Sequence, residues 1–221
     1  GLWAKPESVG KMFKPYNLDV ICFNEVPHGN WTLRVGRELG MTHVHVGKVS
    51  SANHKDKYKS ILSRFPLRDK SEVAFDSKGW KPASVVTART NIKGVPLTLY
   101  STHIPGQPDV ENSAASFISK KMLSDPHNDN LFVLGDFNNL LFEGALKAFK
   151  EAGMKSIWHG LSINTDSIST HRHIESGNES GVIDHIFYRI TKNKVKVTNG
   201  GVIEKAYNSA EEEIEMDRYK K

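Results

Sequence analysis

Short apolar runs, separated by turn residues or by segments with helical spacing, constrain this chain more than any other feature. Runs of four to seven residues rich in Val, Ile, Leu and Phe are typical of buried strands. The runs lie at residues 20–23, 43–46, 60–63, 83–88, 97–101, 131–134 and 182–188. Such a series predicts a protein built around largely buried β-sheet.

The segments between these runs determine the fold class. Apolar residues recur at helical spacing within residues 7–14, 31–39, 112–123 and 144–152. Helices therefore separate some strands, whereas other strands follow one another directly, as around a hairpin turn at residues 91–96. This mixed order favours an α/β sandwich with mixed sheets over a doubly wound parallel sheet. The length of 221 residues suits a single domain covering residues 1–221.

Composition narrows the class of protein. Hydrophobic residues make up 38% of the chain and charged residues 25%, which is typical of a soluble globular protein. No apolar run approaches the ~20 residues that a membrane-spanning helix needs. The single cysteine, Cys22, excludes an intramolecular disulfide, and its apolar neighbours indicate a core residue. No signal-peptide pattern opens the chain. This absence does not decide between a cytoplasmic and an exported protein.

Polar residues stand where several of these runs end. Glu25, His103 and the pair Asp136 and Asn138 follow strands directly, and Asp184 lies inside an apolar run. Taken singly, the first three also suit a surface turn acid, a hydrogen-bonded turn histidine and an Asx turn. Asp184 is harder to explain, because a carboxylate in a buried strand is costly unless it is paired or binds a metal.

Together these residues suggest one polar site at a common sheet edge. Oxygen ligands without cysteine suit Mg²⁺ or Mn²⁺ better than a structural zinc site. The net charge of +5 suits an anionic substrate. The basic residues are scattered, however, and form no block typical of tight binding to duplex nucleic acid.

Five segments, in this order, resemble motifs of the endonuclease/exonuclease/phosphatase superfamily, the group related to DNase I. They are residues 19–26 (DVICFNEV), 61–67 (ILSRFPL), 102–103 (TH), 134–138 (LGDFN) and 183–187 (IDHIF). The segment containing GDFN is the most specific of the five. The resemblance implies an α/β (α+β) fold, namely a DNase I-like four-layer α/β/β/α sandwich of two mixed sheets.

The resemblance also implies a Mg²⁺-dependent (or Mn²⁺-dependent) hydrolase acting on phosphate esters. Glu25 would bind the catalytic metal ion. Asp136 would activate the attacking water, and Asn138 would hold the scissile phosphate. His103 would contact the phosphate and protonate the leaving group, while Asp184 would orient a histidine that follows later in the family.

Three departures from the family pattern affect this prediction. Asn24 replaces the usual glutamine before the metal-binding glutamate. The family's first strand, which ends in an asparagine, has no counterpart here, and residues 2–14 look like the helix that follows that strand. The family's final SDH motif is also missing. We therefore expect a chain that is incomplete at both termini, lacking the first strand and the last strands, and that can be inactive by itself.

Further candidates lie outside the five motifs. Arg64 and His54 are candidate substrate contacts, as are Arg89 and Arg172, because cationic side chains pair well with phosphate. Two histidine pairs, at residues 43 and 45 and at residues 171 and 173, have same-face spacing on a strand. They suggest a second metal such as Zn²⁺, although the sequence shows no complete ligand set.

The leading hypothesis for function is a phosphodiesterase, either a nuclease or an enzyme acting on lipids or small molecules. Its partners would be DNA or RNA, a phospholipid or a small phosphorylated molecule, and we expect a monomer. One alternative is a phosphomonoesterase acting on sugar or inositol phosphates. The other is a catalytically inactive binding module that keeps the fold.

Overall fold

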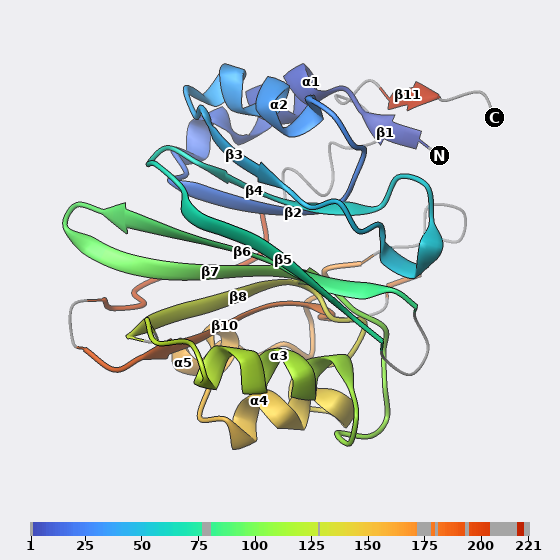
Figure 1. Cartoon of the computed structure of the whole chain (residues 1–221), viewed down its shortest axis with the longest axis vertical. Coiled ribbons are helices and arrows are strands. Elements are labelled where there is room, and N and C mark those ends of the chain that lie inside the picture. The colour runs from blue at the N-terminus through green and yellow to red at the C-terminus, as the bar shows by residue number, and fades with distance from the viewer. Residues whose placement is uncertain are drawn as a thin grey trace.

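The computed structural model describes residues 2–76, 81–127, 129–171, 178–179, 181–192, 195–203 and 216–218. Two β-sheets pack face to face, and helices cover the outer face of each sheet (Figure 1). The order of layers is therefore α/β/β/α, which confirms the predicted fold class. No helix in the described ranges has the length and apolar character needed to cross a membrane.

The first layer pair comes from the N-terminal part of the chain. Its sheet is antiparallel in the order β2-β4-β3, formed by Val20–Val26, Tyr58–Ser63 and His43–Val46. Helices α1 (Pro6–Phe13) and α2 (Trp31–Leu39) cover the sheet (Figure 1). Apolar residues of the helices, of the strands and of the turn after α2 form a small core between these layers: Val9, Ile21, Val35, Met41 and Leu62. Within the described chain, β2 forms one edge of this sheet.

The second sheet has the order β5-β6-β7-β8-β10-β9. Its strands are Arg68–Phe75, Ala83–Ile92, Val95–His103, Asn130–Asp136, Asp184–Ile190 and Lys155–Ser156. The pair β7 and β8 is parallel, and the other neighbouring pairs of this described sheet are antiparallel. Helices α3 (Ala114–Leu123) and α4 (Lys147–Glu151) cover its outer face (Figure 1). The sheet is therefore mixed, as predicted.

The two sheets meet through a separate apolar layer. Ile61 from β4 packs there against Val86 and Ala88 from β6 and Leu99 from β7. Cys22 lies beside this layer, and burial raises the pKa of its thiol to about 12. Cys22 is only partly buried, so the predicted core position is confirmed as contact with this apolar layer and not as full burial.

Each of the seven predicted runs lies in or overlaps a strand, but the sequence missed others. Strand β5 was missed because most of its residues are polar and exposed, as suits an edge strand. The prediction that residues 2–14 are helical is wrong at its start. Leu2–Ala4 forms β1, which pairs with β11 (Met216–Arg218). The helix begins only at Pro6, because proline suits the first helical position and favours an extended residue before it.

Candidate functional site

Three neighbouring strands of the six-stranded sheet each contribute one polar residue to the same row. The parallel pairing of β7 with β8 brings His103 opposite Asp136. The antiparallel pairing of β10 with β8 brings Asp184 opposite Asp136. Two strand ends and one strand start therefore meet at one edge of the sheet, and three of the predicted residues are brought together there.

Glu25 reaches this row from the other sheet. The register of β2 against β4 shifts between Phe23 and Val26, and Glu25 has a φ of 53° at that point. A bulge of this kind turns a side chain out of the regular alternation of the strand. Glu25 Oε1 lies 3.8 Å from His103 Nε2, and Asp136 Oδ2 lies 3.5 Å from the same nitrogen. The two carboxylates therefore face one edge of the imidazole.

Asn24 connects the two halves of the cluster. With the amide oriented to match its two partners, Nδ2 donates to the Thr102 carbonyl oxygen at 3.0 Å and Oδ1 accepts from the Asp136 backbone N–H at 2.8 Å. One side chain on β2 thus satisfies backbone groups on both β7 and β8. Because backbone polar groups away from water need partners, this bridge fixes where β2 lies relative to Asp136. Asn24 is therefore a positioning residue.

The segment after β8 holds Asp136 in place. A Cβ atom on Gly135 would lie 1.8 Å from the Thr102 carbonyl oxygen, so only glycine lets β8 approach β7 this closely. Asn138 has a φ of 48°, and its N–H donates to Asp136 Oδ1 at 2.9 Å. The Asn138 Nδ2 donates to the Ile104 carbonyl oxygen at 2.9 Å. The Asx turn is thus real, and it orients the carboxylate while leaving part of the Asn138 amide for a ligand.

The acid groups of this cluster perturb one another. The pKa of Asp136 is raised to about 7, first by burial and then by the charges of Asp184 and Glu25. Burial also raises the pKa of Asp184, although a hydrogen bond from Thr170 and the nearby His171 each lower it in part. The positively charged groups near these three carboxyl groups therefore do not fully balance their negative charge. Such an excess of one charge is common at functional sites.

Burial has the opposite effect on His103. Its side chain is 3% exposed, and its pKa is lowered to about 4, chiefly because burial disfavours the charged ring. The imidazole is therefore neutral near pH 7 and can donate one hydrogen bond rather than carry a positive charge.

A divalent cation suits this charge distribution. Glu25 is half exposed and offers carboxylate oxygen, and Asp136 adds a second carboxylate nearby. The described residues contain no group of three His, Cys, Asp or Glu side chains arranged to hold a metal ion. Mg²⁺ often binds through only one or two carboxylates and completes its shell with water and substrate phosphate. The residues present therefore fit a hard cation of this kind and not a closed zinc site.

Lys57 supplies a positive charge beside Glu25. Its Nζ lies 2.6 Å from Glu25 Oε1, and both side chains are partly exposed. His54 lies in the same loop, close enough to influence the pKa of His103. The structure thus brings the predicted substrate contact His54 near the cluster, and it adds Lys57, which the sequence did not single out.

Other predicted contacts lie elsewhere. Arg64 donates to the Asp19 carboxylate, the Asn17 side chain and the Leu18 carbonyl oxygen. It follows the end of β4 that pairs with the start of β2, whereas Glu25 stands at the other end of β2. The structure therefore does not bring Arg64 to the cluster.

Arg89 and the pair His43 and His45 also lie away from the cluster, whereas His171 lies close enough to Asp184 to lower the pKa of that carboxyl group. Arg89 binds Asp69 and Asp125, far along β6 from the site. His45 Nε2 is bonded to the Ser71 carbonyl oxygen, and the described residues give the second-metal hypothesis no ligand set. Arg172 and His173 lie outside the described residues.

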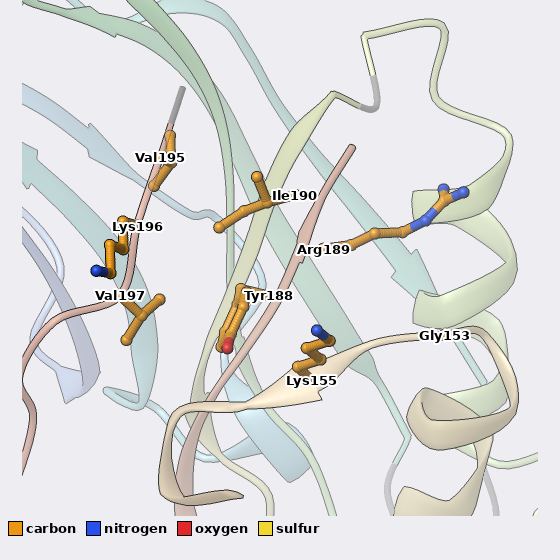
Figure 2. A pocket seen from close by; sticks show the side chains of 8 residues that line it. All are labelled: Gly153, Lys155, Tyr188, Arg189, Ile190, Val195, Lys196 and Val197. Carbon is orange, nitrogen blue, oxygen red and sulfur yellow. The ribbon is translucent and has the colours of Figure 1, made fainter. Parts of the chain in front are cut away.

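Two pockets flank β10. One of about 250 Å³ lies between the sheets and is lined in part by Asn24, Gly135 and Asp184, so it adjoins the cluster. The other, of about 310 Å³, lies at the far end of the strand (Figure 2). Its Lys155 and Lys196 side chains do not converge with that of Arg189, which points away from them (Figure 2). The first pocket therefore belongs to the candidate site, and the second does not.

Two residues of the site escaped the sequence analysis, Asn24 and Lys57. Asn24 was noted only as a departure from the family motif, although its place directly before Glu25 was a usable signal. Lys57 carried no signal, because several lysines of the same loop have similar neighbours in sequence. Its pairing depends on how the loop folds against β2.

Comparison with known proteins identifies the family and supports the fold. The sequence profile of the Endonuclease/Exonuclease/phosphatase family matches residues 4–200. No curated protein sequence matches the chain. Among solved structures, an endonuclease/exonuclease/phosphatase family protein from Leptotrichia buccalis C-1013-b is similar with a TM-score of 0.64. It is 17% identical, and the alignment covers 85% of this chain and 81% of that one.

Two further structures share the fold at low identity. The human Nocturnin catalytic domain with bound sulfate has a TM-score of 0.61 and 16% identity, with 84% of this chain and 78% of that chain covered. D. rerio TDP2 complexed with a single-strand DNA product has a TM-score of 0.60 and 13% identity, with 86% and 79% covered. Since the family profile spans most of the sequence, the chain belongs to the Endonuclease/Exonuclease/phosphatase family.

Proposed function

We propose that this chain is a divalent-cation-dependent phosphodiesterase that hydrolyses its substrate by in-line attack of water. Members of its family hydrolyse phosphate esters and generally use divalent metals. The observation that carries the proposal is the cluster of Glu25, Asp136 and Asp184 at the junction of the two sheets, whose charge Lys57 offsets only in part and in which the pKa of Asp136 is raised to about 7. A carboxylate with this pKa is well suited to accept a proton near neutral pH. Residues 1–221 would act as one domain, since both sheets contribute to the cluster.

In this proposal each side chain has one task. Asp136 orients the attacking water and takes its proton. Asn138 donates the free hydrogen of its amide to a phosphoryl oxygen, and Asp184 helps to keep the pKa of Asp136 high. The neutral imidazole of His103 donates a hydrogen bond to the phosphate, whose negative charge favours protonation of the ring for transfer to the leaving oxygen.

Glu25 would hold the cation, and Mg²⁺ or Mn²⁺ fits its oxygen donors best. When bound, such an ion would neutralise charge on the phosphate and on the leaving oxygen.

Hydrolysis of bis-p-nitrophenyl phosphate with and without Mg²⁺ or Mn²⁺ tests the proposal. We expect a rate that depends on the cation and that falls by about a hundredfold or more in Asp136→Asn, because the base is lost. Asp129→Asn is the matched control, since Asp129 precedes the opposite end of β8 and pairs with Lys192 at the surface. Equal rates in wild type and Asp136→Asn would refute the assignment of the base.

The same assay distinguishes the alternatives. Faster hydrolysis of p-nitrophenyl phosphate or of inositol phosphates than of the diester would indicate a phosphomonoesterase. Binding of a phosphodiester without turnover would indicate a binding module. Because D. rerio TDP2 is complexed with a single-strand DNA product, single-stranded DNA is the first natural substrate to test, beside phospholipids.

A further inference from the structure

Lys57 and Glu25 form an ion pair inside the candidate site. Lys57 Nζ lies 2.6 Å from Glu25 Oε1, a distance typical of a strong charge-assisted hydrogen bond. The Lys57 side chain is 35% exposed and that of Glu25 is 45% exposed. The ammonium therefore occupies an oxygen of the carboxylate that would bind a divalent cation.

The backbone around Lys57 is fixed by its own loop. Its N–H donates to Ser50 Oγ at 2.9 Å, and its carbonyl oxygen accepts from Ser51 N–H at 3.0 Å. Lys57 is therefore presented to Glu25 by a closed turn, which reduces the entropy lost when the ion pair forms.

A second lysine, Lys59, forms hydrogen bonds to residues of the same loop. Lys59 is fully buried, and its Nζ donates to the Val49 carbonyl oxygen at 2.9 Å and to Ser51 Oγ at 3.4 Å. Glu72 accepts from the Val49 N–H as well. Buried polar groups that satisfy one another in this way hold a loop in one conformation. The position of Lys57 is thus built into the fold.

The charges around the pair explain what the lysine does there. Glu25 Oε1 and Asp136 Oδ2 lie 3.8 and 3.5 Å from the same nitrogen of His103, so the Lys57 ammonium on Glu25 stands beside two neighbouring carboxylates. Lys57 therefore offsets part of the negative charge that accumulates where the two sheets meet. A divalent cation at Glu25 would do the same, so the two cations compete for one place.

We propose that Lys57 is an internal counter-ion, which holds Glu25 in the cation-free protein and weakens cation binding there. This inference rests on the proposed function, because it assigns Glu25 to the cation. Lys57 is accordingly a positioning residue that sets cation affinity.

Calorimetric titration with MnCl₂ alone, without substrate, tests the inference. We expect Lys57→Met to bind Mn²⁺ about tenfold more tightly than the wild type, since a partly exposed ion pair no longer has to be broken. Lys57→Arg keeps the charge and should bind like the wild type. Lys55→Met, which removes an exposed lysine from the same loop, should also leave the affinity unchanged.

Unchanged or weaker Mn²⁺ binding by Lys57→Met would overturn the inference. Glu25→Gln separates that failure from failure of the proposed function. If Glu25→Gln loses Mn²⁺ binding while Lys57→Met matches the wild type, only the counter-ion role fails. If Glu25→Gln binds Mn²⁺ as the wild type does, Glu25 is not the cation ligand and both proposals fail.

Discussion

Two aspartates near opposite ends of β8 show how differently one sheet can treat a carboxylate. Asp125 precedes the strand and accepts hydrogen bonds from Tyr100 Oη at 2.6 Å, from Arg89 Nη2 at 2.8 Å and from the His127 N–H at 2.8 Å. Its pKa is lowered, because these donors together outweigh burial. Asp136 ends the strand, and its pKa is raised to about 7.

The difference lies in what each carboxylate faces. Asp125 faces an arginine and a buried hydroxyl, so its charge is neutralised within the fold. Asp136 faces Asp184 and Glu25 and receives one backbone hydrogen bond, from Asn138. The first aspartate stabilises the sheet, whereas the second is kept at a cost that folding alone does not explain. The contrast also shows why Arg89, a candidate phosphate contact by residue type, is structural.

Removing Arg89, which neutralises Asp125 before β8, should have the largest effect on stability. Arg89→Met removes the cation from Asp125 and Asp69, so we expect a loss of about 3 kcal/mol in the free energy of unfolding. Urea denaturation of the variant and the wild type measures this change. Activity per folded molecule should not change, because the site lies at the other end of the sheet. A variant as stable as the wild type would contradict the structural role.

Neutralising Asp136, at the other end of β8, should increase the free energy of unfolding. The folded-state pKa of Asp136, about 7, lies above its ordinary value of 3.8. Stability is therefore lost progressively as the pH rises from about 4 to about 7, because the carboxyl group ionises more readily in the unfolded chain. Asp136→Asn should therefore add about 2 kcal/mol of stability at pH 8 and nothing below pH 4. Urea denaturation in EDTA across this pH range measures the gain. Asp129→Asn should show no such pH-dependent gain.

Removing the bridge between the sheets should affect catalysis more than stability. Asn24→Ala leaves the Asp136 N–H and the Thr102 carbonyl oxygen without their partner. We expect kcat to fall about tenfold with little change in KM, since the base loses its position and not its chemistry. Steady-state kinetics on bis-p-nitrophenyl phosphate provides the measurement. A fall in kcat/KM through KM alone would indicate substrate contact instead.

Arg64→Met should have the smallest effect. Its guanidinium is bound to residues at the far end of β2, so kcat/KM should change by less than about threefold. The same assay, with Asp136→Asn as the positive control, measures it. A larger loss would mean that Arg64 leaves those partners to contact substrate.

Much of this architecture follows from sequence because it depends on local pattern. Apolar runs located the strands around Glu25, His103 and Asp136, and strand ends of one sheet meet at one edge. The helical segment 31–39 was predicted at its observed bounds, since its apolar spacing and the following Gly40 are local signals.

What the sequence could not supply depends on contacts between segments that are far apart in the sequence. The bulge that redirects Glu25 appears only in the pairing of β2 with β4. The bridge from Asn24 needs β7 and β8 to lie beside β2, and the ion pair of Lys57 needs the folded loop. These contacts join residues 32 to more than 100 positions apart, over which a local pattern carries no information.

The division of the site between two sheets has a mechanical consequence. Glu25 belongs to one sheet, and Asp136 belongs to the other. The apolar layer formed by Ile61, Val86 and Leu99 separates the two sheets, so under the proposed function it sets the gap in which the phosphate would bind. Because packed interiors transmit strain, smaller or larger side chains in this layer would change the distance between the two carboxylates without contacting either of them. If the proposed roles of Glu25 and Asp136 hold, the geometry of the site depends on residues of the hydrophobic interior that never contact substrate.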